Sequence, residues 1–259
     1  MQRRRSRMES WKPRLTADGS PTLVHPVHGQ ACHSDSGAWL EACRRYAEPC
    51  RLSERARERR PVRLLDIGTG LGWNLAAALE AVEREGGELD VETYERDSNV
   101  IRTAIEVLGP ELLEVPHEAC YAPVRRALEN ALQRSGPVEL GERSRLHLHL
   151  GDARGTLPSV RTDLRFDAVF LDPFSPQVEP ELWSPDFLAH IAARMAPGSW
   201  LSTYSASLAV RAALASTGLR VGPGPAVGRK AQGTLASPDR DPGPFDARTT
   251  RKLARRLLR

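Results

Sequence analysis

Residues 64–74 read Leu-Leu-Asp-Ile-Gly-Thr-Gly-Leu-Gly-Trp-Asn, an apolar run that enters a glycine-rich segment, and alanine-rich residues follow. This order predicts a strand, a tight turn and a helix. Gly68 and Gly70 have no Cβ, so a ligand can approach their backbone closely, and they tolerate the positive φ angles of a strand-to-helix turn. We therefore expect this turn to present bare backbone amides to a bound cofactor.

Details of this segment favour S-adenosylmethionine over a dinucleotide. A dinucleotide fingerprint has the spacing Gly-x-Gly-x-x-Gly, whereas Gly72 comes only two residues after Gly70. Asp66, at the end of the first predicted strand, would repel a pyrophosphate but suits the cationic methionine end of S-adenosylmethionine, directly or through water. Glu95 ends a second predicted strand, where a carboxylate can bind the ribose diol. Together these residues predict a cofactor site for S-adenosylmethionine.

The hydrophobic pattern predicts an α/β fold. Apolar strands and amphipathic helices alternate from residue 62 to residue 216, which is typical of a doubly wound, mostly parallel sheet with helices on both faces. The strands are expected at 62–67, 90–95, 145–150, 166–172 and 199–204, and the helices at 73–85, 98–108, 119–134, 184–195 and 206–216. We expect this Rossmann-like domain to span residues 59–236. An N-terminal extension, irregular over 1–30 and helical over 37–58, would precede it, and a basic, disordered tail over 237–259 would follow.

Composition limits the kind of protein. The formal net charge is +4, and basic residues concentrate in residues 3–14 and 248–259. These ends can contact a phosphate backbone or remain solvated, and the sequence leaves both readings open.

No apolar run approaches the roughly 20 residues needed to span a bilayer, so we expect a soluble, cytoplasmic protein without membrane contact. The four cysteines lack zinc-site spacing and are expected to be reduced thiols.

Two further aspartates follow predicted strands. Asp172 ends the apolar run 166–172, at the same edge of the sheet as the glycine turn, and Pro173 follows it. A carboxylate there can bond to neighbouring backbone amides, but its position beside the cofactor favours contact with the substrate. Asp152 has two open roles, facing the adenine edge or capping a helix that begins at Ala153.

His147 and His149 alternate on one predicted strand, so both imidazoles lie on one face, as in a metal site. The sequence shows no third ligand. We therefore predict packed or solvent-facing histidines and no metal.

The chain resembles the methyltransferase half of the bifunctional MnmC family, which makes 5-methylaminomethyl-2-thiouridine at the wobble position of tRNA. The resemblance covers about residues 30–236. It rests on His33-Ser34, Gly37-Ala38, Glu41, residues 66–74, Leu171-Asp172-Pro173-Phe174-Ser175-Pro176, Glu181-Leu182-Trp183, Thr203-Tyr204-Ser205-Ala206, Val210-Arg211 and Gly228-Arg229-Lys230.

This resemblance implies a class I S-adenosylmethionine-dependent methyltransferase that methylates the exocyclic amine of 5-aminomethyluridine in the anticodon region of tRNA. Asp172 takes the family's essential acidic position, where a carboxylate can attract the protonated amine, orient it and accept or relay its proton. Asn74, the last residue of the segment 64–74, is expected to contribute to cofactor binding. The resemblance does not extend to the FAD-dependent oxidase half of the bifunctional protein, so the expected substrate is the bare 5-aminomethyl group.

The remaining site predictions concern the tRNA. Phe174, Trp183 and Tyr204 could wall a pocket that stacks the everted base. Of these, we expect Trp183 to serve the site and Phe174 to pack in the core. Arg229 and Lys230 could contact phosphate.

Two other functions remain open. The chain could act on a small amine, as a methyltransferase or an aminopropyltransferase, with incidental basic ends. It could also bind S-adenosylmethionine or RNA without turnover.

Overall fold

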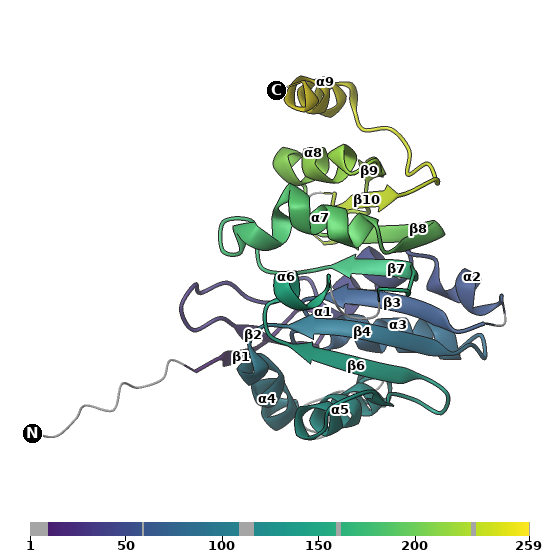
Figure 1. Cartoon of the computed structure of the whole chain (residues 1–259). Helices are drawn as coiled ribbons and strands as arrows, with labels where there is room; N and C mark the ends of the chain where they lie inside the picture. The colour runs from purple at the N-terminus through teal and green to yellow at the C-terminus, as the bar shows by residue number, and fades with distance from the viewer. Residues whose placement is uncertain (1–9, 59, 109–116, 159–161, 229–231, 259) are drawn as a thin grey trace, which may run out of the picture.

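The computed structural model describes residues 10–58, 60–108, 117–158, 162–228 and 232–258, and Figure 1 shows their arrangement. The main sheet has the strand order β5-β6-β4-β3-β7-β8-β10-β9. Its strands are β3 (Val62–Ile67), β4 (Leu89–Glu95), β5 (Val138–Glu139), β6 (Arg145–Leu150), β7 (Phe166–Leu171), β8 (Met195–Thr203), β9 (Arg220–Pro223) and β10 (Thr234–Ser237).

The five central strands β6, β4, β3, β7 and β8 are parallel, whereas β5, β10 and β9 pair antiparallel with their neighbours. The mostly parallel, doubly wound sheet is therefore confirmed. All six residues of β7 are buried, as expected for a parallel strand covered on both faces. The chain runs outward from β3 through β4 to β6 and then returns to β7 on the other side, so the topological switch lies between β3 and β7.

Helices cover both faces of the sheet (Figure 1). One hydrophobic core lies under α3, α4 and α5, and the second lies under α6, α7 and α8. The helices are α3 (Trp73–Glu83), α4 (Ser98–Val107), α5 (His117–Gln133), α6 (Ala153–Thr156), η3 (Pro180–Trp183), α7 (Pro185–Ala192) and α8 (Leu208–Ser216). Local sequence fixes several of their starts: for example, the Ser184 side chain accepts a hydrogen bond from Phe187 N and Pro185 opens α7.

The N-terminal extension is more regular than predicted. Residues 37–58 are mainly helical, as expected, through α1 (Ala38–Glu41), the π-helix η1 (Ala42–Ala47) and α2 (Leu52–Ala56), with a turn between η1 and α2. The region predicted to be irregular instead contains an antiparallel hairpin, β1 (Lys12–Leu15) with β2 (Pro21–Val24). The Asp18 carboxylate stabilises it, because it accepts hydrogen bonds from Ser20 N at 3.0 Å and from Leu40 N at 2.9 Å.

The prediction of a disordered tail is wrong for the described C-terminal residues, which form α9 (Ala247–Leu257). The connection to it is anchored at several points. Asp239 accepts a hydrogen bond from Gly198 N at 2.9 Å, and the Arg211 guanidinium lies 4.4 Å from the ring centroid of Phe245. Asp246 caps the helix by accepting from Arg248 N and Thr249 N, each at 2.9 Å.

None of the helices in the described part of the chain has the length and apolar character needed to cross a membrane.

Candidate active site

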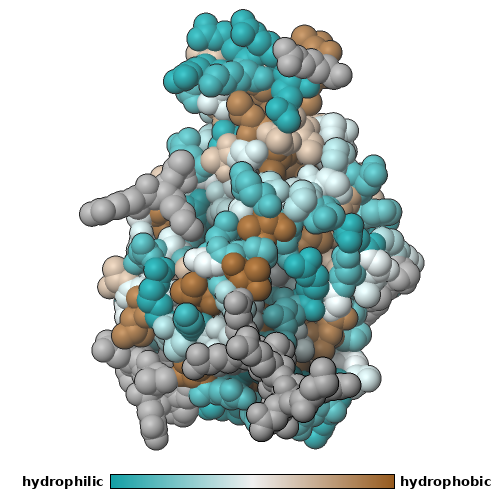
Figure 2. All heavy atoms as spheres, turned by 90° about the vertical axis from the view of Figure 1, so that its left-hand side faces the viewer, coloured by the Kyte–Doolittle hydropathy of each residue, from teal (hydrophilic) through white to brown (hydrophobic). Residues whose placement is uncertain are grey.

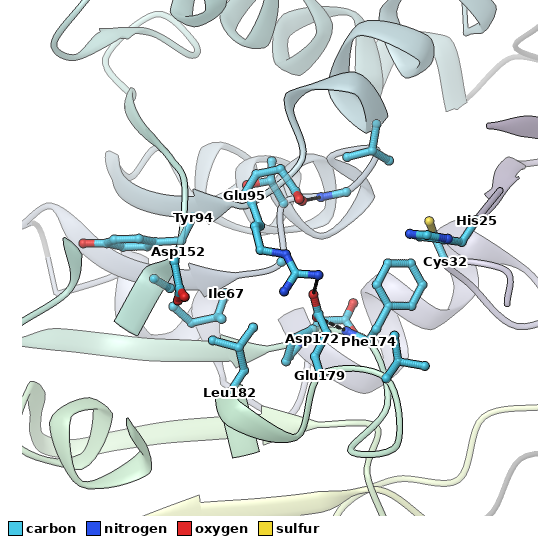
Figure 3. A pocket seen from close by; sticks show the side chains of 18 of the residues that line it. His25, Cys32, Ile67, Tyr94, Glu95, Asp152, Asp172, Phe174, Glu179 and Leu182 are labelled. Carbon is cyan, nitrogen blue, oxygen red and sulfur yellow. Dashed lines mark hydrogen bonds and ion pairs between the residues drawn. The ribbon is translucent and has the colours of Figure 1, made fainter. Parts of the chain in front are cut away.

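A pocket opens at the carboxyl ends of β3, β4, β6 and β7, where the topological switch predicts a ligand (Figure 3). We call it the strand-end pocket. The structure brings seven of the predicted site residues together in its lining: Gly68, Gly70, Asn74, Glu95, Asp152, Asp172 and Phe174. Segments distant in sequence therefore meet at the edge that the strand pattern predicts.

The glycine turn has the predicted conformation but a different hydrogen-bond pattern. Gly68 and Gly70 have φ angles of 95° and 52°. Their amides are not bare, because Gly68 N donates to Tyr94 O and Gly70 N donates to the Glu95 carboxylate, both at 2.9 Å. The expectation that both amides face the cofactor is therefore wrong. Glycine is required at 68 for another reason: an added Cβ would lie 2.5 Å from the Asp172 carbonyl oxygen.

Open space beside the turn fits a bound cofactor. An added Cβ at Gly70 would meet only the Gly68 carbonyl oxygen, at 4.0 Å, and at Gly151 it would meet nothing within 4 Å. Both glycines line the pocket. Their bare Cα atoms leave room for a ligand to contact the backbone.

Glu95 lies in the strand-end pocket at the end of β4. Its carboxylate accepts hydrogen bonds from Gly70 N and Asp97 N, both at 2.9 Å. Burial raises the pKa of Glu95 to about 7, despite these two donors. The group can therefore change its charge near neutral pH.

Asp66 does not line the strand-end pocket, so the direct contact with the methionine end of the cofactor is corrected, whereas the contact through water stays a prediction. Its side chain is fully buried and accepts a hydrogen bond from Thr93 Oγ1 at 2.7 Å, and Thr93 Oγ1 lies 2.6 Å from Thr69 Oγ1. Burial raises the pKa of Asp66 well above its usual range. These hydrogen bonds link Asp66 on β3 through Thr93 on β4 to Thr69 in the glycine turn.

Asp152 caps a helix, as one of its two predicted roles requires, and the predicted contact with the adenine edge stays a prediction. It lines the strand-end pocket and also caps α6, accepting from Arg154 N at 2.9 Å. The hydrogen bond from the Arg154 side chain lowers the pKa of Asp152, so the carboxylate remains charged.

Asp172 is held in place by two side chains from other elements. Asn74 Nδ2, in the first turn of α3, donates to one carboxylate oxygen at 2.8 Å. The Tyr46 hydroxyl, from η1, donates to the other oxygen. Burial, and then the charge of Asp172, raises the pKa of Tyr46 well above its usual value, so Tyr46 stays a protonated donor. Both donors are neutral, so they orient the carboxylate without placing a positive charge beside it.

A second pocket, the side pocket, lies next to the first. Asp172 and Phe174 line both pockets, as do Cys32 and His33. Tyr204 and Glu41 line only the side pocket of the two. Asp172 therefore stands at the boundary between the two pockets.

The three predicted aromatic residues have different environments. Phe174 packs against the rings of Trp11 and His25, at centroid distances of 6.2 and 5.3 Å. Tyr204 donates its hydroxyl to Pro173 O at 2.9 Å. Trp183 is 5% exposed, lines neither pocket and donates to Phe174 O at 2.8 Å. Phe174 lines both pockets, so the positions of these residues favour Phe174 over Trp183 as a base-stacking residue, which is the opposite of the expectation from the sequence. Arg229 and Lys230 lie outside the described residues.

Several pocket residues were missed from the sequence. Trp11 and His25, from the N-terminal hairpin region, line the strand-end pocket beside Phe174. Arg96 forms an ion pair with Glu179 at 3.0 Å, and Glu179 accepts from Phe174 N at 2.9 Å, so the pair fixes the segment after β7 (Figure 3). No sequence pattern marked these residues, because their role depends on contacts between distant segments.

The fold and the site define a class I S-adenosylmethionine-dependent methyltransferase. A family described as "S-adenosyl-L-methionine-dependent methyltransferase" matches residues 116–239. The crystal structure of MnmC2 from Aquifex aeolicus is 35% identical, with a TM-score of 0.79 over 96% of this chain and 77% of that one. The chain belongs to the MnmC-like methyltransferase family.

Two curated relatives are similar in sequence over most of this chain. The bifunctional tRNA 5-methylaminomethyl-2-thiouridine biosynthesis protein MnmC of Methylibium petroleiphilum is 32% identical over 86% of this chain and 33% of its own length. An uncharacterized protein of Methanocaldococcus jannaschii is 30% identical over 85% of this chain and 58% of its own length. The chain thus spans about a third to three fifths of these relatives.

Proposed function

We propose that this methyltransferase methylates the exocyclic amine of a 5-aminomethyl group on the wobble uridine or thiouridine of tRNA. The observation that carries the proposal is the place of Asp172 between the strand-end pocket and the side pocket. The printed name of the MnmC relatives, which refers to 5-methylaminomethyl-2-thiouridine in tRNA, supplies the substrate class.

The strand-end pocket would hold S-adenosylmethionine, which when bound supplies a methyl group activated by a sulfonium centre. Glu95 would accept hydrogen bonds from the ribose hydroxyls, and Asp152 would lie toward the adenine edge. Gly70 and Gly151 would allow close approach to the backbone. Asn74 would act through its hydrogen bond to Asp172 as a positioning residue.

The side pocket would receive the acceptor. An alkylamine is mostly protonated at neutral pH, and the Asp172 carboxylate would attract it, orient it and take its proton so that the nitrogen lone pair can attack. Glu41, which also lines this pocket, is already paired with Arg45 at 3.1 Å. Phe174 and Tyr204 offer aromatic surface for the base.

Tests of this proposal need a tRNA that carries the bare 5-aminomethyl group, prepared from a strain that lacks the final methylation. With labelled S-adenosylmethionine, we expect label in 5-methylaminomethyl nucleosides after digestion of the tRNA. Diamines and polyamines serve as competing acceptors. Label in these amines and none in tRNA would support the small-amine alternative and contradict the proposal.

A pH-dependent contact is expected at Glu95. Hydroxyl donors bind a carboxylate better than a carboxylic acid, so affinity for the nucleoside should rise as pH increases through about 7. We expect at least about a tenfold increase between about pH 5.5 and 8.5, measured by calorimetry. The probe is 5′-methylthioadenosine, which has the ribose but no amino-acid group to titrate. Glu95→Gln should bind more weakly and lose most of this increase; the remainder would come from histidines that line the same pocket, such as His25 and His28. An increase as large as that of the unmodified protein would exclude this role of Glu95.

The tRNA backbone has a candidate contact on α9. Five cationic side chains on this helix are exposed: Arg248, Arg251, Lys252, Arg255 and Arg256. Figure 2 looks onto the side of the molecule where the central strands end, and α9 lies at the top of that view as a mainly hydrophilic segment. We propose that α9 contacts tRNA phosphates while the base enters the side pocket.

Replacing Arg251, Lys252 and Arg255 with glutamine should weaken tRNA binding. Each lost phosphate contact should make the slope of log affinity against log salt shallower by about 0.7 to 0.9, measured by fluorescence anisotropy. The matched control replaces Arg102, Arg126 and Arg134, three exposed cations on or next to α4 and α5 at the other end of the molecule. Equal slopes for the two triple variants would argue against α9 as the contact.

A further inference from the structure

Glu92, His147 and His149 form a polar cluster on the main sheet, and none of the three lines either pocket. Glu92 and His147 are register partners on the parallel strands β4 and β6. His149 lies two residues after His147, so strand alternation places it on the same face. The sequence predicted the two histidines on one face but showed no third ligand, and the neighbouring strand supplies it.

The geometry of the cluster suits a small metal ion. His149 Nε2 lies 2.6 Å from Glu92 Oε2, and His147 Nδ1 lies 3.4 Å from the same oxygen. One potential ligand atom from each residue lies within 4.8 Å of the others. In a tetrahedral zinc site with bonds of about 2.0 to 2.1 Å, ligand atoms are about 3.3 Å apart. Small side-chain shifts would bring the three atoms to that separation.

The surroundings favour an ion with access from solvent. The Glu92 side chain is 3% exposed, whereas His147 and His149 are 25% and 11% exposed. A buried carboxylate next to two partly exposed imidazoles combines negative charge with an entry path. The Tyr94 ring stacks on His149 at 4.5 Å and restricts its orientation, as groups outside a metal's own ligands often do.

We propose that Glu92, His147 and His149 bind a divalent first-row transition metal ion, with Zn²⁺ as the preferred ion. Two imidazoles and one carboxylate are the ligand types that zinc takes, and three protein ligands leave a fourth position for water. The ion would link β4 to β6 just before Glu95 and Gly151, which line the strand-end pocket. Its role is to stabilise the edge of the sheet that carries these residues, independently of the proposed tRNA substrate.

The test uses tag-free, chelator-treated protein and Co²⁺ as a spectroscopic substitute for Zn²⁺. We expect the visible absorption of four-coordinate Co²⁺ to saturate at one equivalent and to disappear when Zn²⁺ is added. Zn²⁺ at about one hundred times its Kd should raise the Tm by about 5 to 10 °C.

Glu92→Gln and His149→Ala should each lose the cobalt spectrum and the zinc-dependent Tm shift. Glu92→Gln can retain a hydrogen bond to His149, so it separates metal binding from simple loss of the contact. The matched control is His28→Ala, because His25 and His28 form another imidazole pair, 4.4 Å apart, in the strand-end pocket. Absence of cobalt binding by the unmodified chain, or loss of binding only in His28→Ala, would overturn the proposal.

Discussion

Asp172→Asn should reduce the single-turnover rate of methyl transfer to 5-aminomethyl tRNA by about 100- to 10,000-fold, the usual contribution of a positioned general base. Asparagine has nearly the same shape as aspartate, but it can neither attract the ammonium group nor accept its proton. Affinity for S-adenosylmethionine and for tRNA should change much less than the rate, because most of the contacts that bind each ligand remain.

The pH profile of Asp172→Asn gives a second readout. If Asp172 removes the proton, the variant should gain rate as pH rises, until the amine is neutral without help. A variant with the normal rate, or with a uniformly low rate at every pH, would contradict the proton-accepting role. The matched control is Asp186→Asn, at an exposed position in the first turn of α7, which should leave the rate unchanged.

The sequence predicted the sheet and the edge of the sheet that carries the site. Both depend on local signals: strands such as β7 are short apolar runs, and Glu95 and Asp172 come at or directly after their ends. Parallel strands bring such residues to one edge of the sheet, regardless of the conformation of the connecting loops. Local pattern therefore sufficed to place Asp172, Glu95 and Asp152 together.

The contacts that orient the site were not predictable in the same way. Tyr46 lies 126 residues before Asp172 in the chain, on the buried side of η1. Its hydroxyl donates to Asp172 only because η1 packs against α3 and β8. A hydrophobic stripe predicts which side of a helix is buried, but it does not specify which polar atom the buried side will meet.

The C-terminal helix shows a different reason for error. Residues 247–257 are rich in arginine, and composition alone predicted disorder. The capping residue Asp246 and the i, i+4 pair Leu253 and Leu257 were available signals, since Asp at an N-cap and apolar residues at helical spacing favour a helix that packs on a neighbour. Leu257 indeed lies with residues of α8 around a shallow depression.

Gly68→Ala should be strongly destabilising, because the added methyl group would lie 2.5 Å from the Asp172 carbonyl oxygen and 2.9 Å from its carbonyl carbon. Backbone atoms cannot move aside as a flexible side chain can. The φ angle of 95° adds the strain of a left-handed conformation. We expect a loss of about 2 to 5 kcal/mol in the free energy of unfolding, from backbone strain and overpacking together.

Gly86→Ala measures the cost of a left-handed backbone conformation without a steric clash, because Gly86 has a φ angle of 70° and open space around its missing Cβ. That variant should lose only about 1 to 2 kcal/mol in urea unfolding and keep its methyl-transfer rate. Gly68→Ala should also transfer methyl groups more slowly at temperatures where it is folded, since displacing the Asp172 carbonyl moves the carboxylate. Equal stability and equal rates in the two variants would show that β7 can shift away from the glycine turn without disturbing the site.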